Sequence, residues 1–157
     1  MANPISGTYA AGDAISFKDC FVEVDVNDEA DWADIDSWAT EITVAGEEVP
    51  TTEVYPFEGS AIVFAGSKSP VTVTCTIVYT EGTDDPFHNI RARFEAVDGA
   101  PFEIRFAPAG SGAGNKRFTT AGGKLIAAPP PQGAGDASSA TVSTFQVRAD
   151  SLTQGTM

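Results

Sequence analysis

Carboxylates are the side chains most able to do chemistry in this sequence, and they are concentrated near its start. The 157-residue chain has 22 Asp and Glu against 9 Lys and Arg, which gives a formal net charge of -13. Between Asp19 and Glu58 lie 13 carboxylates and no Lys or Arg. This charge argues against a protein that grips nucleic acid, because phosphate contacts need clustered Lys and Arg.

One part of the acidic segment matches the spacing of a calcium loop. Asp25, Asn27 and Glu29 fit the first three ligand positions of an EF-hand, and Asp36 falls at the twelfth. The sixth position is Ala30 where the sharp turn needs Gly, and no pair of helices is predicted around the loop. We therefore favour a solvated acidic loop over a cation site.

Motifs for nucleophiles, phosphates and zinc fail on inspection. The glycine-rich runs 110–114 and 122–124 lack the helix start or the Ser/Thr that a phosphate loop needs. The only histidine, His88, is predicted at a surface or capping position and cannot form a zinc site with two distant cysteines. Acidic pairs could serve a hydrolase, but no pair stands out. The sequence predicts no enzyme, no cofactor and no metal.

Most elements that must position these residues are strands. Alternating side chains predict strands over 19–26, 38–44, 71–80, 102–106 and 141–149, with shorter ones near 51–55, 61–65, 116–120 and 124–128. Cys20 and Cys75 each lie in an alternating apolar row, which predicts buried thiols in strands. We expect a mainly β fold, a β-sandwich or barrel of about eight strands with one flanking α-helix.

The helix is predicted over about residues 86–97. Asp85 suits the N-cap, Pro86 suits the first helical position, and Gly99 is a stop signal. An apolar stripe at helical spacing is expected to pack on a sheet. Its members are Phe87, Ile90, Phe94 and Val97.

The length suits a single domain over residues 1–157. We expect a flexible N-terminal arm (1–17), a long loop (45–58) and a free C-terminal tail (150–157). The first residues lack the basic segment and the apolar segment that are typical of a signal peptide, so secretion by a signal peptide is not expected. The longest apolar run, 61–65, is far shorter than the ~20 residues of a membrane helix, so no membrane insertion is expected.

Long alternating strands leave edges that must be covered or paired with another copy. A sandwich with flexible ends and no catalytic residues favours a subunit that assembles, and pairing of identical subunits closes rings or grows filaments.

The order and spacing of several segments resemble the major tail tube proteins of long, non-contractile-tailed (siphovirus-type) bacteriophages. An acidic hairpin precedes DSWATEITV (36–44) and the loop into YPFEGS (55–60). The strand VTVTCTIVY (71–79) then leads through TEGTDDPF (80–87) into the single helix, and FEIRF (102–106) and FQVR (145–148) follow. The match covers about residues 19–149.

This resemblance implies a structural virion protein of the tail, assembled in the bacterial host cytoplasm. Such subunits form homohexameric rings that stack into a tube around a tape-measure protein, meet tail-tip and terminator proteins, and later let DNA pass without specific binding. Inner strands of neighbouring subunits would join into one barrel. Loops and terminal arms would make ring-to-ring contacts, here 1–17, 45–58 and 150–157.

In such a ring the charge acquires a role. Six subunits of charge -13 carry -78, and a bore lined by carboxylates would repel DNA during ejection. The candidates for the bore are on polar faces of predicted strands: Glu23, Asp25, Glu41 and Glu103. The alternative for each is an ordinary outer-surface carboxylate. Because like charges oppose assembly, we expect assembly to increase with ionic strength.

Two other classes remain open. The first is a monomeric β-sandwich that binds a carbohydrate or protein ligand, with Trp32, Trp38 and Tyr55 as candidate stacking residues. The second is another ring-forming tail protein, such as a terminator or decoration protein, whose rings would not stack.

Overall fold

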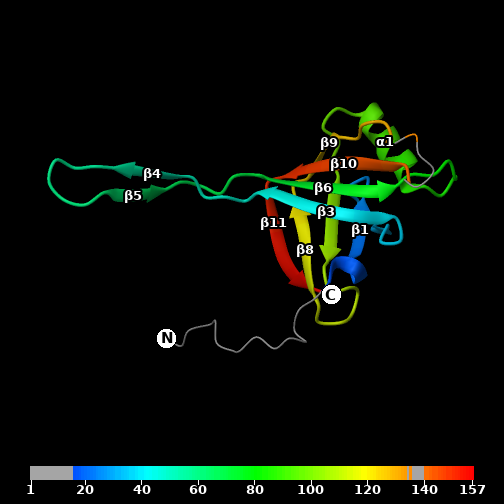
Figure 1. The fold of residues 1–157 in the computed structure, drawn as a ribbon, viewed down its shortest axis with the longest axis horizontal. Helices are drawn as coiled ribbons and strands as arrows, with labels where there is room; N and C mark the ends of the chain where they lie inside the picture. Colours follow the sequence, from blue (N-terminus) through cyan, green and yellow to red (C-terminus); the bar gives the residue numbers. More distant parts are fainter. Residues whose placement is uncertain (1–15, 134, 136–139) are drawn as a thin grey trace.

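Two antiparallel sheets pack against each other in the computed structural model, which describes residues 16–133, 135 and 140–157 (Figure 1). The five-stranded sheet has the order β11–β8–β7–β1–β2, with bounds Ser151–Thr156, Lys116–Ala121, Glu103–Ala107, Phe21–Asp25 and Ala33–Asp34. The four-stranded sheet has the order β3–β6–β10–β9, with bounds Ala39–Gly46, Val71–Val78, Val142–Ala149 and Lys124–Ala127. A separate hairpin pairs β4 (Thr51–Val54) with β5 (Ile62–Ala65), and a 3-10 turn covers Phe17–Asp19. The mainly β prediction is confirmed.

The core lies between the two sheets and follows the alternation of the sequence. Alternate residues of β6 and β10 are buried, so one face of the four-stranded sheet points inward along its full length. Phe145 of this sheet meets Phe102 beside β7 edge to face, with ring centroids 5.7 Å apart. The other large buried side chains are Ile35, Ile77, Ile90, Ile104, Leu125, Val22, Val24, Val71, Val73 and Val147.

Helix α1 (Pro86–Ala96) forms where the capping residues predict it. The buried Asp85 carboxylate accepts hydrogen bonds from the amides of Phe87 (2.9 Å) and Thr80 (2.5 Å), which fixes both the helix start and the preceding loop. Phe87 and Ile90 are buried, and Phe94 packs at the margin of the core. Val97 is the C-cap and 43% exposed, so including it in the packing stripe was wrong.

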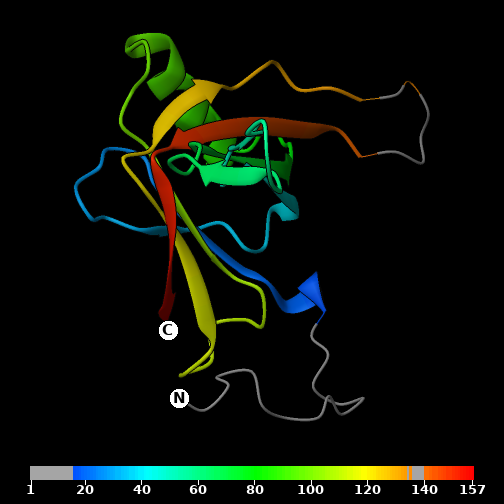
Figure 2. The same cartoon turned by 90° about the vertical axis from the view of Figure 1, so that its left-hand side faces the viewer.

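The C-terminal residues are not a free tail, which corrects the sequence prediction. β11 pairs with the whole of β8, from Ser151 opposite Ala121 to Thr156 opposite Lys116. The chain passes from the four-stranded to the five-stranded sheet at Asp150, whose amide donates to the Ala121 carbonyl (3.0 Å). Figure 2 shows β11 running away from the end of β10 at this corner. The predicted N-terminal arm lies outside the described residues except for positions 16 and 17.

The predicted loop 45–58 belongs to a long hairpin. Residues 47–70 leave the end of β3, pass through β4 and β5, and return to β6, and we call them the arm. Figure 1 shows the arm extending far from the sandwich, along the direction of β3 and β6.

Candidate assembly surfaces

The base of the arm is held by backbone conformation and paired polar contacts. Gly46 has φ +93°, and a Cβ there would collide with the carbonyl of Pro70, so the turn out of β3 requires glycine. Glu48 and Ser69 exchange two hydrogen bonds, one from the Ser69 amide to the Glu48 carbonyl (2.8 Å) and one from the Glu48 amide to Ser69 Oγ (3.0 Å). Glu47 also pairs with Lys68 at 3.6 Å. The two legs therefore leave the sandwich in a fixed register.

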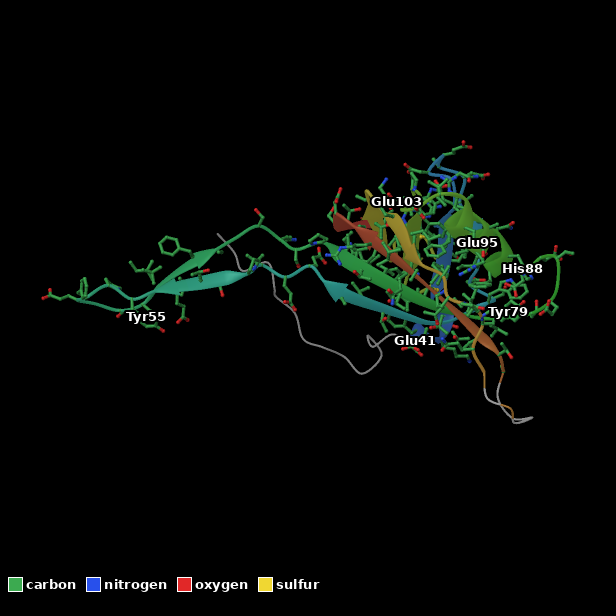
Figure 3. All side chains as sticks on the ribbon, turned by 90° about the horizontal axis from the view of Figure 1, so that it is seen from above. Glu41, Tyr55, Tyr79, His88, Glu95 and Glu103 are labelled. Carbon is green, nitrogen blue, oxygen red and sulfur yellow. The ribbon has the colours of Figure 1, made fainter. Side chains whose placement is uncertain are left out.

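Beyond its base, the arm presents apolar side chains to solvent. Two-stranded hairpins are marginally stable in water on their own, and β4 and β5 pair only with each other among the described strands. Most of the large exposed apolar side chains of the described chain belong to the arm: Val49, Val54, Tyr55, Phe57, Ile62, Val63 and Phe64. Figure 3 shows Tyr55 on the arm, far from the sandwich. Several large apolar side chains exposed on one segment in this way mark an interaction site.

The outer face of the four-stranded sheet is polar but carries little charge. Its paired positions are mostly hydroxyl and amide side chains from three neighbouring strands. They are Thr43, Thr72, Thr74, Thr76, Thr144 and Gln146. The side chains of Thr76 and Thr144 are within hydrogen-bonding distance, 3.3 Å. The middle of this face is thus near neutral on a strongly acidic chain.

Charged residues on this face lie at its two ends. Glu41, opposite Thr76, is at the end away from the arm. Lys124 and Arg148 lie opposite each other on β9 and β10, at the end from which the arm leaves. They line a hollow of about 490 Å³ together with Pro70, Gly122, Ile126, Ala149 and Asp150.

Of the four carboxylates predicted to face a bore, Glu41 is the one on this outer face. Glu23 lies in the five-stranded sheet and forms an ion pair with Arg105, and both side chains are largely buried. The Arg105 guanidinium also covers the ring of Trp32, 4.1 Å from its centroid. The Glu23 carboxylate thus has a structural partner within its own subunit. Whether Glu41 lines a bore stays a prediction.

Asp25 and Glu103 also have structural partners. Asp25 is 2% exposed, and its carboxylate accepts from the amides of Asn27 (3.2 Å), Glu29 (3.3 Å) and Ala30 (2.7 Å). These contacts use the acceptors that a calcium ion would need. Glu103 accepts from the Thr120 hydroxyl and from the amide of Gly123 (2.9 Å). In Figure 3, Glu103 and Glu41 lie on opposite sides of the body.

The two edges of the four-stranded sheet differ. β3 is paired with a strand on one side only, that of β6. The outer edge of β9 is partly occupied, because the Leu125 amide donates to the Ala100 carbonyl (2.9 Å) and the Phe102 amide to the Gly123 carbonyl (3.1 Å). Beside β3 lies a hollow of about 210 Å³, lined by Phe17, Lys18, Cys20, Val22, Asp36 and residues 39–42. The β3 edge is therefore the more open of the two for another chain.

Within the described residues, no group of three or more His, Cys, Asp or Glu could hold a metal ion. The ring of His88 lies edge to face with Tyr79, with centroids 5.7 Å apart. Both cysteines are free thiols, and burial raises the pKa of Cys20 to about 11 and that of Cys75 to about 12. No helix of the described part of the chain is long and apolar enough to span a membrane.

The three aromatics considered for glycan stacking do not share a surface. Trp32 is covered by Arg105, Trp38 packs against the core, and Tyr55 lies on the arm. The geometry thus gives no joint platform to the carbohydrate-binding alternative.

The exposed strand of the arm and the Lys124–Arg148 pair could not be predicted from the sequence pattern. The run 61–65 was expected as a strand, but its apolar composition gave no sign that the strand would be exposed. Lys124 and Arg148 were not singled out, because only the pairing of β9 with β10 brings them together. Alternation of polar residues along each strand was the available signal, and it does not say which strands are neighbours.

Comparison with solved structures finds this fold in chains of tail and injection-system particles. A chain of the PVC extracellular contractile injection system, from its sheath–tube complex in the extended state, matches with a TM-score of 0.65 and 14% identity over 96% of this chain and 100% of that one. A chain of the anti-feeding prophage tube-terminating cap matches with a TM-score of 0.63 and 13% identity, over 99% of this chain and 97% of that one. A chain from the C6-symmetric tail of an empty GTA particle matches with a TM-score of 0.59 and 11% identity, over 92% of this chain and 99% of that one.

No protein-family model and no curated protein matches the sequence. At these identities the comparisons establish the fold, which is the one that chains of such tails, tubes and caps share.

Proposed function

We propose that this chain is a structural subunit of a phage-type tail tube, which forms hexameric rings that stack into a hollow tube. The observation that carries the proposal is the arm, whose apolar side chains are exposed in the isolated subunit and need a second copy to cover them. The shared fold supports the same conclusion, and one similar chain comes from a tail with C6 symmetry.

The ring would be built from the four-stranded sheet. One face of this sheet is covered by the five-stranded sheet and α1, so its outer face is the one that can line a bore. The open edge of β3 would meet one neighbouring subunit, and the unoccupied part of the outer edge of β9 would meet the other. The arm, which extends the strand direction, would reach the adjacent ring.

The partners proposed from the resemblance fit this arrangement. They are further copies of the chain, a tape-measure protein, tail-tip and terminator proteins, and DNA in transit during ejection. The location would be the tail of a virion, with assembly in the host cytoplasm. The resemblance favours a long non-contractile tail, whereas two similar chains come from a contractile injection system. The native particle distinguishes the two kinds of tail, because a contractile tail has a sheath around its tube and a non-contractile tail has none.

A closed ring that does not stack is the second candidate, because chains of a tube-terminating cap and of a sheath/tube terminator share the fold. The arm favours the tube subunit, since a surface that projects beyond the ring serves stacking.

Negative-stain electron microscopy of the purified protein, concentrated in low and high salt, tests the proposal. We expect hollow tubes of uniform width, longer in high salt because screening weakens repulsion between rings of charge -78, six times -13. Single rings in all conditions would support the terminator. Monodisperse monomers at every concentration and salt, with or without a tail-tip complex, would overturn both.

A further inference from the structure

Two cations lie directly opposite each other on the outer face of the four-stranded sheet. Lys124 of β9 pairs in register with Arg148 of β10, and both side chains are exposed. Directly opposed side chains on neighbouring strands have Cβ atoms about 4.5–5.5 Å apart, and like charges at that distance destabilise the pair. In a chain with 9 cations against 22 carboxylates, such a pair is better explained by an anionic ligand than by the fold.

The surroundings of the pair define what that ligand can be. The pair lines the hollow of about 490 Å³ at the arm end of the sheet, where Asp150 is the one carboxylate among the lining residues. The neighbouring outer-face positions on β6 and β10 are Thr72, Thr74 and Gln146, and Ile126 of β9 is exposed beside Lys124. Hydroxyl and amide side chains with Lys and Arg are the groups that contact sugar and phosphate without reading sequence.

The paired positions of this face include no aromatic side chain. Binding of single strands relies on aromatic platforms for the bases, so the surface suits a duplex, whose charge lies on its outside. An acidic polypeptide would meet the cations equally well but would gain less from a face of hydroxyl groups.

We propose that the Lys124–Arg148 pair is a non-specific contact for the phosphate backbone of duplex DNA. The inference rests on the proposed function, in which this face lines the bore. Each hexameric ring then carries a band of these cations at one end and a band of Glu41 at the other. Carboxylates elsewhere on the ring act weakly at this site, because charges farther away than about 8 Å are screened at physiological salt.

The test compares two variants with the same change of net charge. Lys124→Gln/Arg148→Gln removes the pair, and Lys116→Gln/Arg117→Gln removes two cations from β8 of the five-stranded sheet, outside the arm and the proposed bore. Binding of a fluorescently labelled 20-base-pair duplex is measured by anisotropy between 20 and 200 mM salt, on tubes and on soluble subunits. We expect the first variant to bind DNA roughly tenfold more weakly than wild type. The salt slope, which is the slope of log binding constant against log salt concentration, should become shallower by about 2. The control should match wild type in both quantities.

Each outcome decides the question. Equal DNA binding by both variants, or none by wild type, overturns the contact. Poly-glutamate that competes as well as duplex DNA at equal charge overturns it in favour of an acidic protein. If only the first variant fails to form tubes, the pair is a contact between subunits. If wild type forms no rings, the proposed function fails. The DNA contact is then judged on the soluble subunit alone, where a salt slope equal in wild type and in the first variant overturns it.

Discussion

The arm offers the sharpest quantitative prediction. In the hairpin register Ile62 lies opposite Val54, and Phe64 lies opposite Thr52 on the same face. We expect Ile62→Thr/Phe64→Thr to weaken assembly without weakening the fold, because these side chains contribute to the arm and not to the core. Threonine, like isoleucine and phenylalanine, favours a strand, so the hairpin itself is little affected.

The expected magnitude follows from exposure. Ile62 is 50% and Phe64 56% exposed, so contact with a neighbouring ring can bury about half of each residue. Full burial of such side chains is worth about 1.5–3 kcal/mol each, and the two halves together therefore give about 1.5–3 kcal/mol. Since every 1.4 kcal/mol is a factor of ten, the critical concentration for tube growth should rise roughly 10- to 100-fold.

The assay is sedimentation of tubes across a concentration series, with Val97→Thr as the control, because Val97 is 43% exposed and outside the arm. The thermal melting point of the subunit is measured in parallel and should not change. A critical concentration equal to wild type would refute the role of the arm. A fall in melting point that accounts for the loss of tubes would show that the arm packs on its own sandwich.

Three further predictions concern the subunit alone. Asp85→Ala should destabilise the fold by about 2–4 kcal/mol in urea denaturation, because it leaves the buried amide of Phe87 and the half-buried amide of Thr80 without an acceptor; a loss below about 1 kcal/mol would contradict this. Cys20, whose pKa is raised to about 11 by burial and then by Asp36, should react with iodoacetamide at pH 8 on the order of 100-fold more slowly than a free thiol. The pKa of Asp36 is raised, first by partial desolvation and then by the neighbouring Asp34 carboxylate, so its contribution to stability falls as pH rises; because Asp36 is exposed, Asp36→Asn should melt only slightly higher than wild type at pH 7 and no higher below about pH 3.5, and an equal gain at both would refute this.

Much of the sandwich could be predicted from local pattern, because its central strands alternate strictly. β6 and β10 follow the apolar rows that contain Cys75 and Phe145, and α1 follows the Asp85–Pro86 start. β11 could not be predicted, since Thr153, Gln154 and Gly155 carry no apolar alternation. That strand forms because the corner at Asp150 delivers it to the edge of β8, a contact that depends on the tertiary fold.

The candidate site was less predictable because alternation tells which residues share a face but not what covers the face. Glu23 and Glu103 alternate with core residues as expected, yet they bind Arg105 and Thr120 of the five-stranded sheet. Asp25 is buried because the following loop, with φ near +60° at Asp28 and Ala30, folds back and donates three amides to it. Only the pairing of strands reveals such partners.

The distribution of charge changes how a tube of this subunit would treat its cargo. A net charge of -13 suggested a uniformly negative bore, but the face available to line it has hydroxyl groups between one carboxylate and two cations. Repulsion by the ring as a whole is long-ranged and is weakened by salt, whereas contacts at Lys124 and Arg148 act at short range. Repulsion would thus act mainly between rings, where it limits stacking, while the bore would slow a DNA duplex weakly and at regular intervals. Raising the salt should then promote tube growth and weaken DNA binding in the same preparation. A uniformly negative bore would not bind DNA at low salt, so raising the salt would cause no loss of DNA binding.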